Sequence, residues 1–119
     1  MNQLIFSLTL VVSLQHWFFL ILECFLWNKP LGMRVFRMSK ERANSTATLA
    51  MNQGVYNGFL SVGLLCCAML PDQFGPSVLV FFHACVVTAA VVGAATISKK
   101  VLFIQGAPAA LALAAIYFA

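Results

Sequence analysis

Four long apolar runs dominate this chain and leave it few folds to choose from. They cover residues 3–27, 48–70, 76–97 and 101–118 of a 119-residue sequence. An α-helix rises about 1.5 Å per residue, so about 20 apolar residues cross the ~30 Å hydrocarbon core of a bilayer. Each run is at or near that length. The sequence therefore predicts an all-α, polytopic membrane protein, a four-helix transmembrane bundle that forms one transmembrane domain over residues 1–119.

The composition supports a lipid environment. The chain is 62% hydrophobic and only 8% charged, whereas a soluble domain usually carries about 25% charged residues. We therefore expect the lipid bilayer to be its main partner. The formal net charge is +4, but the basic residues are clustered around the apolar runs and do not indicate nucleic-acid binding. They are Lys29, Arg34, Arg37, Lys40 and Arg42 in the segment 28–47, followed by Lys99 and Lys100.

This charge distribution orients the predicted helices. The connection between the second and third runs carries only Asp72, and cytoplasmic loops are the ones rich in Lys and Arg. With four spans, both basic segments fall on the same side. We expect them in the cytoplasm, with both termini outside the inner (plasma) membrane. In the long basic loop, Leu31, Val35 and Met38 recur at helical spacing, which leaves open a short interfacial helix or a solvated loop.

Glu23 is the most unusual residue of the first run. A carboxylate at membrane depth costs about 3 kcal/mol on insertion scales, so we expect Glu23 to have a hydrogen-bonding partner or a functional role. His16, Leu20, Glu23 and Trp27 are spaced four, three and four residues apart and share one helix face. His16 and Glu23 lie two turns apart, about 10 Å along the axis. That distance is too long for a direct hydrogen bond, but the two can share a polar channel.

A second group of polar residues opens the second run. It contains three amides and a phenol within six residues, and Gln105 lies near the start of the fourth run. In the predicted topology these groups and Glu23 occupy the same cytoplasmic half, and polar groups in lipid must find partners. We therefore predict that they converge, with His16 nearer the midplane. The candidate site is Glu23, Asn52, Gln53, Tyr56, Asn57, Gln105 and His16.

Gly54 and Gly58 form a GxxxG pair within the same segment. Glycines at this spacing let a neighbouring helix approach closely. The pair predicts a contact with another helix, either within the chain or in a homodimer.

Four functional hypotheses follow from the polar cluster. The first is a pocket, entered from the cytoplasm, that binds a small or lipophilic molecule. The second is a structural role, in which Glu23 accepts hydrogen bonds from the amides and anchors the bundle. The third is a proton-coupled small transporter, and the fourth is a membrane isomerase-like enzyme. The sequence has no nucleophile–base spacing, metal-ligand spacing or phosphate-binding loop, so no catalytic residue, metal or cofactor is predicted.

Several of these segments carry a family likeness. They are His16-Trp17 with Glu23 and Trp27, and residues 52–59, 93–96 and 105–109. The chain resembles the small bacterial inner-membrane proteins catalogued as domain of unknown function 1304. The resemblance implies a four-helix integral membrane protein and implies no activity.

The small multidrug transporters offer a looser comparison. They have a similar length and a proton-coupling glutamate in the first helix, which Glu23 resembles. The strong charge bias of this chain differs from the weak bias of members that insert in both orientations. Its amide-rich second run is also unlike theirs.

Overall fold

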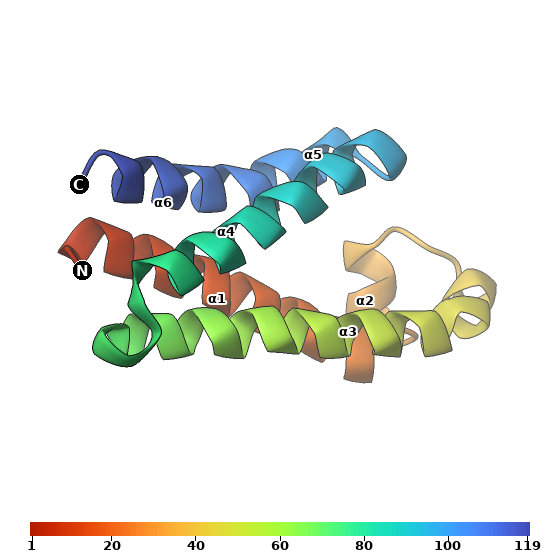
Figure 1. Cartoon of the computed structure of the whole chain (residues 1–119). Coiled ribbons are helices and arrows are strands. Elements are labelled where there is room, and N and C mark those ends of the chain that lie inside the picture. Colours follow the sequence, from red (N-terminus) through yellow and green to blue (C-terminus); the bar gives the residue numbers. More distant parts are fainter. The chain divides into compact units, whose positions relative to one another are not determined.

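The protein is helical along its length. The computed structural model describes residues 1–119, apart from the side chain of Val101. The elements are α1 (Gln3–Phe25), α2 (Pro30–Val35), α3 (Lys40–Met69), α4 (Pro71–Thr96), α5 (Lys99–Val101), the π-helix η1 (Leu102–Gly106) and α6 (Ala107–Tyr117) (Figure 1). The predicted all-α class is confirmed, and α1, α3, α4 and the segment that ends in α6 are the main helices.

The chain divides into two compact units. Unit 1 comprises Met1–Gln15 and Leu60–Ala119, and unit 2 comprises His16–Phe59. Helices α1 and α3 each contribute residues to both units.

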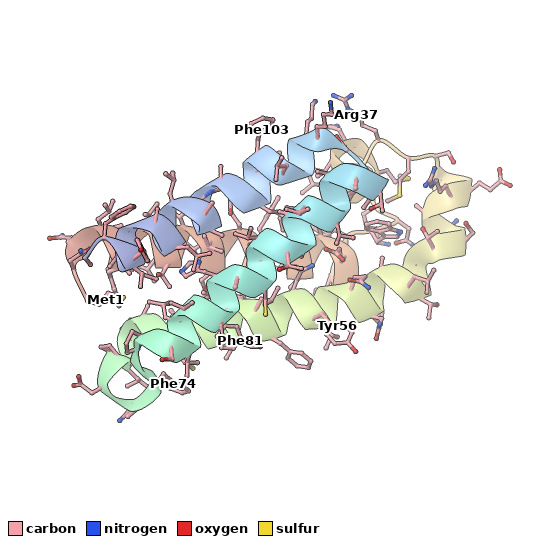
Figure 2. All side chains as sticks on the ribbon, turned by 45° about the horizontal axis from the view of Figure 1, so that its top comes forward. Met1, Arg37, Tyr56, Phe74, Phe81 and Phe103 are labelled. Atoms are coloured by element: carbon pink, nitrogen blue, oxygen red, sulfur yellow. The ribbon has the colours of Figure 1, made fainter. Side chains whose placement is uncertain are left out.

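Two helices are long and apolar enough to cross a membrane. They are α1 and α4, and Leu102–Tyr117 forms a shorter apolar helix. Only 28% of the most apolar window of α1, and 28% of that of α4, is buried within the chain. Most residues of these windows are therefore at least partly exposed. Phe81 on α4 and Phe103 in η1 are exposed aromatic side chains (Figure 2).

Helix α3 begins earlier than the second apolar run. The helix begins at Lys40, eight residues before residue 48, where the run begins. Ser39 stabilises this earlier start because its Oγ accepts a hydrogen bond from the Arg42 backbone N–H at 3.2 Å. Glu41 lies in the first turn, where a negative charge interacts favourably with the helix dipole. The basic segment also contains α2, which begins at Pro30.

A glycine separates the start of α4 from its long part. Gly75 has φ 71° and ψ 168°, a region that side-chain-bearing L-residues rarely adopt. The residues before Gly75 form a short helical segment, and the long helix begins at Pro76, where the third run was predicted to begin. Space for a side chain exists at Gly75, because a Cβ would meet no described atom within 4 Å. The backbone conformation, not packing, therefore requires glycine here.

The fourth run contains a π-helical turn that periodicity did not predict. Pro108 has no N–H to donate to the carbonyl of Ile104, four residues earlier. The side chain of Gln15 on α1 donates to that carbonyl instead, with a distance of 2.9 Å from Nε2 to the oxygen. The wide turn of η1 lies at this point, consistent with a local rearrangement that keeps the backbone bonded.

Unit 1 combines an apolar core with buried polar pairs. Ser13 and Ser61 each donate from Oγ to the other's backbone carbonyl at 2.9 Å. Thr9 Oγ1 lies 3.1 Å from His83 Nε2. These pairs join α1 to α3 and to α4. The core around them consists of Ile5, Val12, Leu64, Cys67, Leu79, Val86 and Ala109.

In unit 2, α1 and α3 pack closely at the glycine pair. A Cβ on Gly54 would lie 2.5 Å from Cys24 Sγ and 3.2 Å from the Cys24 backbone nitrogen. A Cβ on Gly58 would lie 2.5 Å from Leu20 Cδ1, the end of a flexible side chain. Both glycines therefore contact another helix of the same chain, one of the two possibilities that the GxxxG spacing predicted.

These contacts predict unequal effects of adding a methyl group. The methyl group of Gly54→Ala meets both Cys24 Sγ and the Cys24 backbone nitrogen, so we expect it to lower the free energy of unfolding by about 1–2 kcal/mol despite its better helix propensity. Gly58→Ala should be nearly neutral because Leu20 can rotate away, whereas Gly58→Leu should destabilise. Thermal unfolding in one detergent measures all three. Equal effects of Gly54→Ala and Gly58→Ala would contradict the packing described here.

Candidate functional site

An amide on α3 connects two titratable side chains of α1. Asn57 Nδ2 donates to Glu23 Oε1 at 2.7 Å. Asn57 Oδ1 lies 2.8 Å from His16 Nδ1. All three residues belong to unit 2. We refer to His16, Asn57 and Glu23 as the polar chain. The two α1 residues are too far apart to bond directly, and Asn57 spans the gap between them.

The direction of these hydrogen bonds follows from the chemistry of the amide. A carboxylate only accepts hydrogen bonds, so the Asn57 nitrogen faces Glu23. The Asn57 oxygen then faces His16 and can only accept. His16 Nδ1 must therefore carry the hydrogen in this arrangement, which leaves Nε2 as the acceptor nitrogen of a neutral ring.

Burial differs along the polar chain. His16 is 1% exposed, and among the described residues its Nε2 has no hydrogen-bond partner. Glu23 and Asn57 are half-buried. One end of the polar chain is therefore a partly exposed carboxylate, and the other end is an imidazole that the protein encloses.

The other predicted site residues lie differently. Asn52, Gln53 and Tyr56 are exposed on α3, and Tyr56 is labelled in Figure 2. The Tyr56 ring makes an edge contact with the Phe59 ring. Gln105 lies in η1, in unit 1. Of the three amides considered as partners for Glu23, Asn57 is the one that bonds it.

The end of α1 has a second polar contact that sequence reasoning missed. Trp27 Nε1 donates to Thr46 Oγ1 at 3.0 Å, and the Trp27 ring packs against Phe36 with centroids 4.7 Å apart. Thr46 in turn donates to the Arg42 carbonyl at 2.7 Å. The hydroxyl lies in the segment treated as a loop, and its helical position on α3 is what directs it toward Trp27.

The polar face of α1 also extends further than predicted. Thr9 and Ser13 precede His16 by seven and three residues, and all three are buried. Continuing the four-and-three spacing backwards from His16 finds both hydroxyls. The signal was present in the sequence, but single hydroxyls in an apolar run are common because they can bond their own helix backbone.

Unit 1 contains a cavity of about 320 Å³. Its wall is mostly apolar and includes Ile5, Cys67, Leu79 and Ile116, together with Asp72. The residues of the polar chain do not contribute to this wall. Within the part of the chain that the structure describes, His, Cys, Asp and Glu side chains do not gather in threes.

The geometry predicts that Asn57 stabilises the fold far more than a neighbouring amide. Asn57→Ala leaves His16 Nδ1 and Glu23 Oε1 without their partner. Each such loss at a buried group costs about 1–3 kcal/mol, so we expect a destabilisation of about 2 kcal/mol or more. Asn52→Ala, an exposed change on the same helix, should remain within about 0.5 kcal/mol of wild type. Thermal unfolding in a common detergent compares the two.

Substitutions at Glu23 serve as the control for this prediction. Glu23→Gln keeps an oxygen that can accept from Asn57 and should retain most of the stability. Glu23→Ala should lose it. If Asn57→Ala and Asn52→Ala unfold at the same temperature, the polar chain does not hold the helices together.

Comparisons with known proteins identify relatives without an assigned activity. The model of a family described as "Protein of unknown function (DUF1304)" matches residues 10–117. The "Uncharacterized protein YpaA" of Lactococcus lactis subsp. lactis (strain IL1403) is 32% identical over 120 residues, which covers 99% of this chain and 100% of that protein. No solved structure matches the chain.

Proposed function

Given that the chain belongs to the DUF1304 family of proteins of unknown function, we propose that it is a four-span inner-membrane protein that binds a small lipophilic molecule at Glu23. The observation that supports this proposal most directly is the half-buried Glu23 carboxylate on α1, which is held by the Asn57 amide of α3. The membrane placement and the binding site are supported by separate observations.

Outward-facing apolar side chains support the membrane placement. On α1, Leu14 and Phe18 are 66% and 48% exposed, and on α4, Phe81 and Val92 are 62% and 56% exposed. Such surfaces are stable in lipid and would aggregate in water. In the proposed arrangement, α1, α3, α4 and the helix ending in α6 span the bilayer. The basic segment 28–47 and the Lys99–Lys100 pair lie in the cytoplasm.

Reporter fusions test this orientation. A fluorescent protein fused after Lys40 should fold and fluoresce, because that position is proposed to be cytoplasmic. The same reporter fused after Gln73 should be dark, and alkaline phosphatase fused there should be active. Fluorescence from the Gln73 fusion would overturn the topology without affecting the described contacts.

The carboxylate of Glu23 supports the binding site. An ionised carboxylate has about four lone-pair sites, and the described structure provides it with one side-chain donor, Asn57. The group is half-buried and remains reachable. A molecule with an ammonium group and an apolar body would satisfy the charge and remain soluble in lipid. A lipophilic amine is therefore the ligand class that fits best.

The polar chain favours binding over proton conduction. A proton that moved from Glu23 to His16 would have to pass Asn57. The nitrogen lone pair of an amide is delocalised into the carbonyl, so an amide does not relay protons as water or a carboxyl group does. Proton-coupled transport would therefore need another path, whereas binding needs only the carboxylate.

Titration calorimetry with an alkylamine tests the binding proposal. Wild-type protein in nanodiscs should bind decylamine, with empty nanodiscs as the baseline for partitioning into lipid. Glu23→Gln removes the charge and keeps the shape, so we expect at least a tenfold loss of affinity, about 1.4 kcal/mol. Gln53→Ala, a change at an exposed amide on α3, should bind like wild type.

Decanol provides a control for the apolar body. It should bind more weakly than decylamine, since it offers a neutral donor. Equal affinity of wild type and Glu23→Gln for decylamine would exclude the proposed site and leave Glu23 as a structural anchor.

A further inference from the structure

Asn57 is bonded at both ends of one small rigid group. Its nitrogen lies 2.7 Å from Glu23 Oε1 and its oxygen 2.8 Å from His16 Nδ1. The two ends of an amide have opposite hydrogen-bonding character and nearly the same shape. If one of the two amide atoms faces Glu23, the other amide atom necessarily faces His16.

With Glu23 ionised, the polarity runs in one direction. The Asn57 nitrogen donates to the carboxylate, the Asn57 oxygen accepts, and His16 carries its hydrogen on Nδ1. The neutral ring then has a lone pair on Nε2, which is buried and has no partner among the described residues.

With Glu23 protonated, the same atoms can bond in the opposite direction. The carboxyl O–H donates to the Asn57 oxygen once the amide has rotated by half a turn. The Asn57 nitrogen then donates to His16 Nδ1, which must present a lone pair. A neutral ring in that state carries its hydrogen on Nε2. After the reversal, Asn57 still makes one hydrogen bond to Glu23 and one to His16.

From this geometry we propose that Asn57 is a two-position coupler, which converts protonation of Glu23 into a change of His16 tautomer. One proton is added to the carboxylate from the surroundings. The imidazole gives its Nδ1 proton to the surroundings and takes another from them at Nε2, so its own proton count is unchanged and the net uptake is the one proton on Glu23. His16 Nε2 therefore changes from a hydrogen-bond acceptor to a donor, about 10 Å along α1 from Glu23.

Cys24, Tyr56 and Arg34 are other titratable groups of unit 2, and none of them makes a described hydrogen bond to the polar chain. Cys24, next to Glu23, donates to the Met51 carbonyl at 3.5 Å. Tyr56 on α3 is 56% exposed, and Arg34 on α2 is also exposed. The coupler depends on hydrogen-bond geometry alone and does not require the ligand proposed above.

Nitrogen-15 NMR of labelled histidine tests the coupler directly. The protein is studied in nanodiscs without amine, and His83→Gln identifies the His16 signals. Carboxyl carbon-13 labelling of Glu23 and Glu41 follows the carboxylates in the same samples, with Glu23→Gln assigning the Glu23 signal. We expect His16 to be the Nδ1–H tautomer above the Glu23 titration and the neutral Nε2–H tautomer below it.

Two variants separate coupling from a local effect. Asn57→Leu should abolish the tautomer change, whereas Asn52→Leu on the same helix should retain it. If Asn57→Leu does not fold, Glu23→Ala replaces it, and its His16 should keep one neutral tautomer until the ring itself is protonated. A wild-type His16 that keeps the Nδ1–H form through the Glu23 titration, or becomes imidazolium in that step, overturns the proposal. Amine binding by wild type would be unaffected by that result.

Discussion

The structure depends on the side-chain hydrogen bonds that join α1 to the other helices. A buried donor or acceptor that loses its hydrogen-bond partner costs about 1–3 kcal/mol. Ser13 exchanges hydroxyl–carbonyl bonds with Ser61, Gln15 bonds the Ile104 carbonyl, and Asn57 holds both His16 and Glu23. Because each bond joins particular positions on two helices, a shift of one residue along either helix would break it. These polar contacts thereby specify the register of the helices.

Much of the helical content could be predicted from hydropathy, and part of the site from spacing. The apolar runs located α1, the long part of α4 and the last helix, and the spacing of His16 and Glu23 placed them on one face. The hydrogen-bond partner of Glu23 could only be narrowed to three amides. Gly54, Asn57 and Gly58 lie on the side of α3 that meets α1, whereas Asn52 and Gln53 are exposed. Which side of α3 meets α1 is a property of packing and not of any one segment.

The less predictable features arise where backbone chemistry overrides hydropathy. The beginning of α3 was placed by the loss of apolar character, but Ser39 and Glu41 continue the helix into a charged segment. The π-turn of η1 follows from Pro108 and from a side chain on a distant helix, Gln15. A proline in an apolar run indicates a disturbed helix. It does not indicate which residue bonds the released carbonyl, since that residue lies 89 positions away.

Gly75 has a stereochemical consequence. Its φ of 71° and ψ of 168° are close to the mirror image of an ordinary extended residue. An L-amino acid is strained in this conformation, whereas a D-amino acid would adopt it readily. A Cβ at this position would meet nothing within 4 Å among the described atoms. The connection between α3 and α4 thus requires an achiral residue or one of inverted handedness, and the size of the side chain is secondary.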